Sequence, residues 1–212
     1  MALLINSLKE AIEFSLNRYY CKELFLEETK SVQLHAFGDA SESSYGACVY
    51  LRCEHESDVH CNLVAAKTRV APMTKQTIPR LELLSCLVAA RLLVSVKEAI
   101  SEILTIESET MWTDSTTALH WIRNTEKEYK VWVQNRITEI RKLTATETWR
   151  YCPTQFNLGD VASRGALALQ LINDDNWWHG PDFLQNPVEL WPVLPIKEPE
   201  NSPDYCQELK SN

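Results

Sequence analysis

A long helix that is apolar on nearly all sides is the feature that most constrains the fold of this 212-residue chain. Pro79 marks its start, because a fixed φ and a missing N–H suit the first helical turn. The helix is expected over residues 80–100, and its apolar residues do not form a single stripe: Leu81, Leu83, Leu84, Leu87, Val88, Leu92, Leu93, Val94 and Val96. A helix of this kind must be buried, and we expect it to pack against the face of a sheet.

Three strand-like segments precede this helix, at residues 32–37, 45–51 and 61–70. The first is apolar and leads into Gly38 and Asp39, and the second is rich in residues that favour strands. The connections between the segments are short and polar, which predicts an antiparallel meander.

The remaining strands are expected after the helix. Residues 110–113 and 146–152 are predicted strands, residues 131–143 are a predicted amphipathic helix, and two more helices should begin near Asp114 and near Asp160. Because helices lead into each of the last two strands, each should lie parallel to a neighbour. The sequence therefore predicts an α/β fold with a mixed five-stranded sheet, three antiparallel strands and then two parallel ones, and helices on both faces.

The chain is expected to have three parts. Residues 1–30 should form an N-terminal helical extension, in which apolar residues recur at helical spacing: Leu8, Ile12, Leu16 and Tyr19. Residues 31–172 should form the main domain. Residues 173–212 are rich in Trp, Pro and acidic residues, and they should cross the domain surface and be partly disordered. Three tryptophans are the expected anchors of this extension: Trp177, Trp178 and Trp191.

Composition limits the setting and the partners. The chain is 45% hydrophobic and 24% charged, which is typical of a soluble globular protein. No uncharged apolar run approaches the ~18 residues that span a bilayer, and charge comes too early at the N-terminus for a secretory signal. An intracellular location without membrane contact is therefore expected. The net charge of −8 argues against a free-standing nucleic-acid binder, so most affinity for a nucleic acid would come from elsewhere.

The seven cysteines are odd in number and include no Cys-x-x-Cys pair. The simpler interpretation is buried thiols in a reducing compartment. The alternative is a zinc site in an expected hairpin connection, with the ligands Cys53, His55, His60 and Cys61. Their spacing fits no familiar zinc-ligand pattern.

Four carboxylates lie within short, well-marked motifs. Asp39 lies in LHAFGDAS, Glu82 in IPRLELL, Asp114 in MWTDSTTAL and Asp160 in NLGDVASRG. The predicted topology places strand ends and helix starts at one edge of the sheet, where the four acids can meet. Acids that converge repel one another strongly unless divalent cations lie between them. A site of this kind with two Mg²⁺ ions is suited to phosphodiester chemistry.

Each acid also has an ordinary structural explanation. Asp39 could be a turn residue after Gly38, and Glu82 could complement the helix dipole from the first turn. Asp114 and Asp160 could each be a helix N-cap. These explanations stay open at the level of single residues.

The ordered set of motifs resembles the ribonuclease H domains of retroelement polymerases. The closest resemblance is to the BEL/Pao group of LTR retrotransposons, and it spans residues 31–192. It is carried by the segments LHAFGDASESSYGACVYLR, LVAAKTRVAP, TIPRLELL, WTDSTTALHWI, NLGDVASRG and WWHGPDFL. The resemblance implies a ribonuclease H-like fold.

The resemblance also implies an activity, which is hydrolysis of the RNA strand of RNA–DNA hybrids with two Mg²⁺ ions, for which Mn²⁺ can substitute. Asp39 would bridge both ions, Glu82 and Asp114 would complete the shell of one, and Asp160 would complete the other. Contacts to 2′-hydroxyls and duplex shape would select the hybrid. The implied partner is an upstream reverse transcriptase region of one polyprotein, with residues 1–30 as the tail of its connection region. The implied location is the cytoplasm, a retroelement particle or the nucleus.

The chain departs from the ribonuclease H pattern in two places. Many of these enzymes carry a histidine in the loop before the last aspartate, and residues 151–157 contain none. The basic protrusion after the second helix is reduced to KEYK at residues 127–130. Both departures predict weak activity for the isolated chain.

Other functions remain as alternatives. The chain could be a catalytically inactive domain that acts as a structural or interaction module of a polyprotein. Pao-type sequences of this region are also grouped under a retrotransposon peptidase heading, but an aspartic peptidase needs Asp-Thr-Gly or Asp-Ser-Gly, and residues 114–116 read Asp-Ser-Thr. Integrase-like enzymes place the Glu last, and proofreading exonucleases pair Asp and Glu two residues apart, and neither pattern occurs here.

Overall fold

A mixed five-stranded sheet forms the centre of the molecule, in a computed structural model that describes residues 29–56, 58–193 and 203–210. The expected helices before residue 29 lie outside the described residues. The strands are β1 (Ser31–Ala40), β2 (Ser44–Glu54), β3 (Val59–Val70), β4 (Ser108–Thr113) and β5 (Trp149–Tyr151). Their order across the sheet is β3-β2-β1-β4-β5, so β1 is the central strand.

The strand directions confirm the predicted sheet. β1 pairs antiparallel with β2, and β2 pairs antiparallel with β3. β4 lies parallel to β1, and β5 lies parallel to β4. The strands of the first hairpins are longer than predicted, because the second connection is confined to the four residues 55–58. β5 is shorter than predicted, because Thr146–Thr148 forms a turn of 3₁₀ helix instead.

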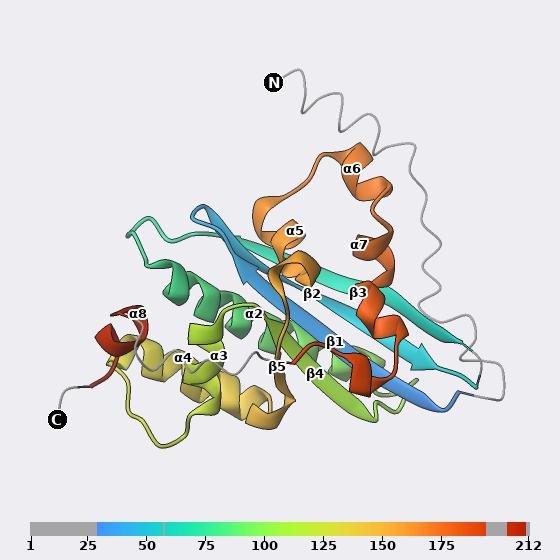
Figure 1. Cartoon of the computed structure of the whole chain (residues 1–212), viewed down its shortest axis with the longest axis horizontal. Coiled ribbons are helices and arrows are strands. Elements are labelled where there is room, and N and C mark those ends of the chain that lie inside the picture. The colour runs from blue at the N-terminus through green and yellow to red at the C-terminus, as the bar shows by residue number, and fades with distance from the viewer. Residues whose placement is uncertain (1–28, 57, 194–202, 211–212) are drawn as a thin grey trace.

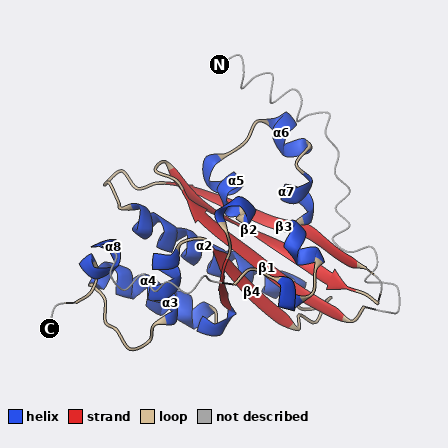
Figure 2. Cartoon of the chain, viewed as in Figure 1, coloured by secondary structure: helices blue, strands red, loops and turns tan. Residues whose placement is uncertain are grey.

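Helices cover both faces of the sheet, as Figures 1 and 2 show. On one face lie α2 (Ile78–Ile100), α3 (Thr116–Arg123) and α4 (Val131–Leu143), whose buried residues share one core with the sheet. On the other lie α5 (Gly159–Arg164) and α7 (Asp175–His179), with α6 (Ala168–Ile172) between them in the chain. A short helix near the C-terminus, α8 (Pro203–Gln207), packs beside α4.

The alternation of β1 shows how the two faces are separated. Leu34 and Ala36 point into the core under α2, whereas Phe37 points into the second core, which is mainly aromatic. This is the period of two that a strand imposes on its side chains. The all-round apolar helix is explained as well, because α2 contacts both the sheet and α4.

The C-terminal extension contributes to the second core. Trp177 and Trp191 are buried there, which confirms two of the expected anchors, and Trp178 is partly buried. Tyr50 donates its hydroxyl to the Trp177 carbonyl at 2.8 Å, and the buried Arg52 donates Nε to the Leu184 carbonyl at 2.7 Å. Residues 173–193 therefore pack onto the sheet.

The cysteines in the described part of the chain are thiols, and five of these six are buried. The proposed zinc site is wrong. Cys53 lies in the core under α2, whereas Cys61 lies in the second core, so their sulfur atoms face opposite sides of the sheet. Four ligands around one ion require their donor atoms on one side.

Candidate active site

Three of the four acids meet at one edge of the sheet. Asp39, Glu82 and Asp114 each place a carboxylate oxygen within 4.8 Å of the other two. The register explains two of them. Phe37 on β1 is paired with Trp112 on the parallel strand β4, and each aspartate follows two residues later. Residues two apart on neighbouring strands point to the same side, so the two aspartates end next to each other.

Helix α2 supplies the third acid because it approaches β1 closely. A Cβ added at Gly38 would lie 3.1 Å from the backbone of Ser85, so a larger residue would press on the helix and glycine lets it approach closely. Glu82 lies one turn before Ser85 and is therefore next to the end of β1. The helix begins at Ile78, two residues earlier than predicted, and its first turn contains no acid. The expectation that Glu82 complements the helix dipole from the first turn is therefore wrong.

One oxygen of the Glu82 carboxyl group has no hydrogen-bond partner in the part of the chain that the structure describes. This atom, Oε2, is buried. Burial, together with the negative charges of Asp39, Asp114 and Asp160, raises the pKa of Glu82 to about 9. Glu82 is therefore protonated at neutral pH when no cation is bound.

Asp39 is buried and lies on β1, so it is not a turn residue. Burial raises its pKa to about 6, and the charges of Asp114 and Asp160 act in the same direction. Two hydrogen bonds oppose this shift in the pKa, one from the Ser163 side chain and a weaker one from the Ala40 backbone. Ser163, on α5, donates its hydroxyl to Asp39 Oδ2 at 2.5 Å. This hydrogen bond stabilises the charged form and fixes the orientation of the carboxylate.

Asp114 is not the N-cap of α3. That position belongs to Ser115, whose Oγ accepts from the backbone N–H of Ala118 at 3.2 Å. Asp114 instead accepts a hydrogen bond on Oδ1 from Asn157 Nδ2 at 2.9 Å. Asn157 is buried and also donates to the carbonyl of Gly38 at 3.1 Å. It thus ties the ends of β1 and β4 together at the site.

Asp160 lies in the first turn of α5, and Leu158 rather than Asp160 occupies the N-cap position. The carboxylate of Asp160 forms an ion pair with Arg164 one turn later. It is not part of the three-oxygen group, although its charge raises the pKa of both Asp39 and Glu82. Gly159 permits this proximity, because a Cβ there would lie 2.7 Å from the backbone nitrogen of Asp39.

Two site residues, Asn157 and Ser163, were not assigned from the sequence. Both lie in the motif around Asp160, three residues before it and three residues after it. Their polar side chains within an otherwise apolar and small-residue segment were the available signal. Only the three-dimensional arrangement shows that Asn157 donates a hydrogen bond to Asp114 and that Ser163 donates one to Asp39.

The strand order, the helices on both faces and the acids at one sheet edge define a ribonuclease H-like domain. Sequence comparison agrees with this class. The model of the Pao retrotransposon-like RNaseH-like domain matches residues 3–115, which include Asp39, Glu82 and Asp114. Because this match covers more than half of the chain, the chain belongs to that family. No curated protein matches its sequence.

Solved structures of ribonucleases H are similar at low identity. The N-terminal ribonuclease H domain of a Mycobacterium tuberculosis protein is 12% identical, with a TM-score of 0.44, over 67% of this chain and 96% of that one. Ribonuclease H1 of Halobacterium salinarum is 14% identical, with a TM-score of 0.40, over 66% and 98%. LC11 ribonuclease H1, solved with an RNA/DNA hybrid, is 12% identical, with a TM-score of 0.41, over 66% and 99%. Within the described residues, no helix is long and apolar enough to cross a bilayer.

Proposed function

We propose that the chain is a metal-dependent endonuclease that hydrolyses the RNA strand of RNA–DNA hybrids. The observation that carries this proposal is the convergence of three carboxylates around a buried Glu82 oxygen without a hydrogen-bond partner. A chain gains no stability from such an arrangement alone, because like charges repel and an unbonded buried oxygen is costly. Membership of a ribonuclease H-like family supports the same conclusion.

The donor set fits magnesium or manganese. All three donors of the group are carboxylate oxygens, which hard divalent cations prefer. A cation among them would give Glu82 Oε2 a partner and would favour the ionised form of each acid. We propose that these residues would hold two ions: Asp39 would contribute to both, Glu82 and Asp114 to one, and Asp160 to the other. When bound, the ions would activate a water nucleophile and stabilise the leaving oxygen of the RNA.

The chain's own residues would hold the ligands in place. Asn157 orients Asp114 through its amide, and Ser163 orients Asp39 through its hydroxyl. Hydrogen-bond partners of this kind fix the direction of ligand lone pairs. The proton on Glu82 must leave before that carboxylate can bind a cation, since its pKa is raised to about 9. Arg164 holds Asp160, and this ion pair would have to rearrange for the second ion.

The proposed substrate and context follow from the family. Hybrids would be selected by 2′-hydroxyl contacts and duplex shape, which distinguish RNA-containing duplexes from DNA. An upstream reverse transcriptase region of one polyprotein would supply much of the affinity for the hybrid, because this chain carries a net charge of −8. We place its action in the cytoplasm or in a retroelement particle.

Cleavage of a labelled RNA–DNA hybrid with Mg²⁺ or Mn²⁺ tests the proposal. The full chain should cut the RNA strand, and Asp114→Asn should not. Asp58→Asn is the matched control, because Asp58 is exposed and follows the end of β2, eight residues along that strand from Gly46, the partner of Asp39. If neither the full chain nor its variants cut, and Mn²⁺ does not raise the melting temperature, the domain is instead a structural or interaction module of its polyprotein.

A further inference from the structure

The described C-terminal residues dock into a groove at the far end of the domain from α6 (Figure 1). Tyr205 of α8 is fully buried, and its hydroxyl lies 3.1 Å from that of Tyr129. The ammonium of Lys127 lies 5.4 Å from the centre of the Tyr205 ring. The ring of His120 on α3 meets the same tyrosine edge-on at 6.1 Å. The docking is therefore specific for an aromatic residue at this position.

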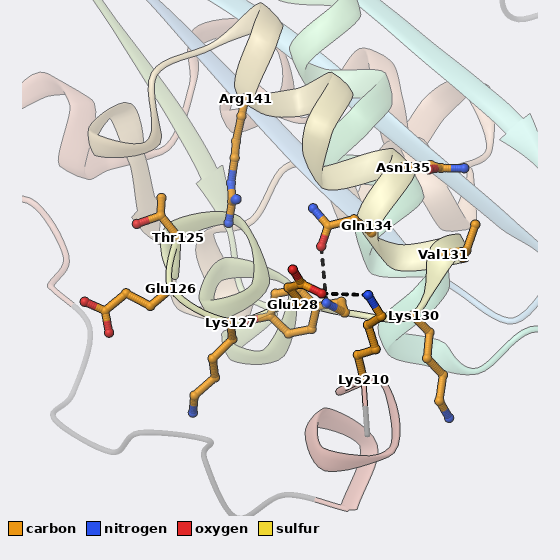
Figure 3. Close-up of a pocket in the computed structure, with 11 residues that line it drawn as sticks. Thr125, Glu126, Lys127, Glu128, Lys130, Val131, Gln134, Asn135, Arg141 and Lys210 are labelled. Atoms are coloured by element: carbon orange, nitrogen blue, oxygen red, sulfur yellow. Dashed lines mark hydrogen bonds and ion pairs between the residues drawn. The ribbon is translucent and has the colours of Figure 1, made fainter. Parts of the chain in front are cut away.

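Backbone pairing extends this contact along the loop that follows α3. Lys130 N–H donates to the Glu208 carbonyl at 2.8 Å, and Lys210 N–H donates to the Glu128 carbonyl at 3.1 Å. Tyr129 and Leu209 form an antiparallel bridge between these bonds. Figure 3 shows the result, a pocket of about 780 Å³ that is lined by the loop 125–130, by residues of α4 and by Lys210, which lies beside the loop and pairs with Glu128.

The strongest polar contact of the segment is with Arg80 on α2. Arg80 donates Nε and Nη2 to the two oxygens of Glu208 at 2.8 and 3.1 Å, and the Glu208 side chain is only 5% exposed. The guanidinium of Arg80 also lies 4.8 Å from the centre of the Trp132 ring. Arg136 lies 4.1 Å from the centre of the same ring. Two guanidinium groups thus meet at one indole, and Glu208 pairs with one of them, Arg80.

We infer that Arg80, Lys127, Trp132 and Arg136 form a surface for the sugar–phosphate backbone of the hybrid, and that residues 205–210 cover this surface in the free protein. The inference rests on the proposed function, because the hybrid is the partner. A guanidinium fork that fits a carboxylate also fits a phosphate. Glu208 and Tyr205 thus occupy the positions that a phosphate and a stacked group would take.

The position of the surface supports a shared substrate. Arg80 and Glu82 lie on one turn of α2, so the surface and the acids are separated by about the 10 Å diameter of a helix. Backbone phosphates recur every ~3.4 Å along a strand. A duplex whose scissile phosphate lies at the acids therefore brings further phosphates to Arg80.

Binding of a labelled hybrid to the Asp114→Asn chain, which leaves the RNA intact, tests the inference. Adding Glu208→Gln should tighten binding about 10-fold at low salt, and the salt dependence should steepen by about one unit in the log–log slope, as one more cation reaches a phosphate. Glu189→Gln is the matched control with the same change in charge, since Glu189 is exposed and lies outside the groove. It should change binding less than about twofold.

A third substitution and a second measurement make the test independent of folding. Arg80→Gln should abolish the gain that Glu208→Gln gives. Thermal melting follows the folded fraction of each variant. If Glu208→Gln folds poorly, Tyr205→Phe replaces it in the test. This variant keeps the ring packed and loses only the contact to Tyr129, so it should give a smaller gain in hybrid binding. Equal hybrid affinities of Glu208→Gln and Glu189→Gln would overturn this inference and leave the proposed function standing. Absence of hybrid binding by every variant, with no cleavage by the unsubstituted chain, would overturn it together with the proposed function.

Discussion

Two clusters of charged side chains include residues only two apart on α2, Arg80 and Glu82, and they differ in whether the chain supplies the opposite charge. At Glu82 three carboxylates converge, and no described cation pairs with any of the three. At Arg80 two guanidinium groups lie against one indole, and the chain's own Glu208 carboxylate pairs with Arg80. One cluster is left without its counter-charge, and the other carries it internally.

The difference separates a ligand site from an internal contact. Uncompensated buried charge is expensive, and the fold lowers that cost at the acids by holding a proton on Glu82. Compensated charge stabilises the docked segment and costs much less. On the two proposals above, the acids would take a cation from solution, whereas the arginines would take an anion only when the segment lifts.

The largest expected effect is at Asp39, which we propose as a ligand of both ions. Asp39→Asn should reduce hybrid cleavage more than about 100-fold, because losing a mere hydrogen-bond partner of a ligand already costs 10–100-fold. The same variant should melt higher than the unsubstituted chain without metal, because repulsion is relieved. Cleavage assays and thermal melting with and without Mn²⁺ measure both. Retained cleavage would remove Asp39 from the site.

The positions of these acids show how far a sequence can be interpreted. Strand order and direction were predictable, because the apolar helix and the βαβ connections leave few topologies. That let Asp39 and Asp114 be placed side by side. The caps were less predictable. Asp114 and Ser115 both suit an N-cap, and only the helix start decides that Ser115 takes the position.

Long-range contacts were beyond the sequence. The bond from Asn157 to Asp114 joins residues 43 positions apart, and the bond from Arg80 to Glu208 spans 128. No local pattern encodes such pairs, since each depends on how the helices pack. The docking of residues 203–210 was missed for the same reason, because a Pro-rich acidic segment predicts no packing of its own.

Asn157 gives the next largest effect. Asn157→Ala should lower cleavage 10–100-fold, since Asp114 loses its orienting donor. It should also cost about 1–3 kcal/mol of stability, because the buried carbonyl of Gly38 loses its partner. Asn176→Ala, at an exposed position on α7, is the control and should change neither. Full activity with lowered stability would assign Asn157 a purely structural role.

The same substitution at two glutamates tests the opening contrast directly. Without metal at pH 8, Glu82→Gln should stabilise the chain, whereas Glu208→Gln should destabilise it by about 1–3 kcal/mol through loss of a charged hydrogen bond. Chemical denaturation of both variants measures the two signs. If both substitutions changed the stability in the same direction, the two clusters would not differ in whether the chain supplies the opposite charge.

Glu82 also predicts how stability depends on pH. The unfolded chain releases the Glu82 proton above pH 4.5, whereas the folded metal-free chain holds it up to about pH 9. Stability should therefore fall as pH rises between these values, by up to about 1.4 kcal/mol per pH unit. Glu82→Gln should flatten this slope, and denaturation at several pH values measures it. An unchanged slope would show that another group causes the dependence.

Substitution of Ser163 should give the smallest effect, because Ser163 is a hydrogen-bond partner of the proposed metal ligand Asp39 and is not itself a ligand. Its hydroxyl lowers the pKa of Asp39, opposing the burial that raises it to about 6. Ser163→Ala should therefore raise that pKa further, so that Mn²⁺ binding requires a higher pH. The binding midpoint should move up by at most about one pH unit, the equivalent of one hydrogen bond of ordinary strength. Ser95→Ala, exposed on α2, should leave the midpoint in place. A downward shift for Ser163→Ala would mean that the hydroxyl competes with the cation for Asp39 instead of preparing the carboxylate for it.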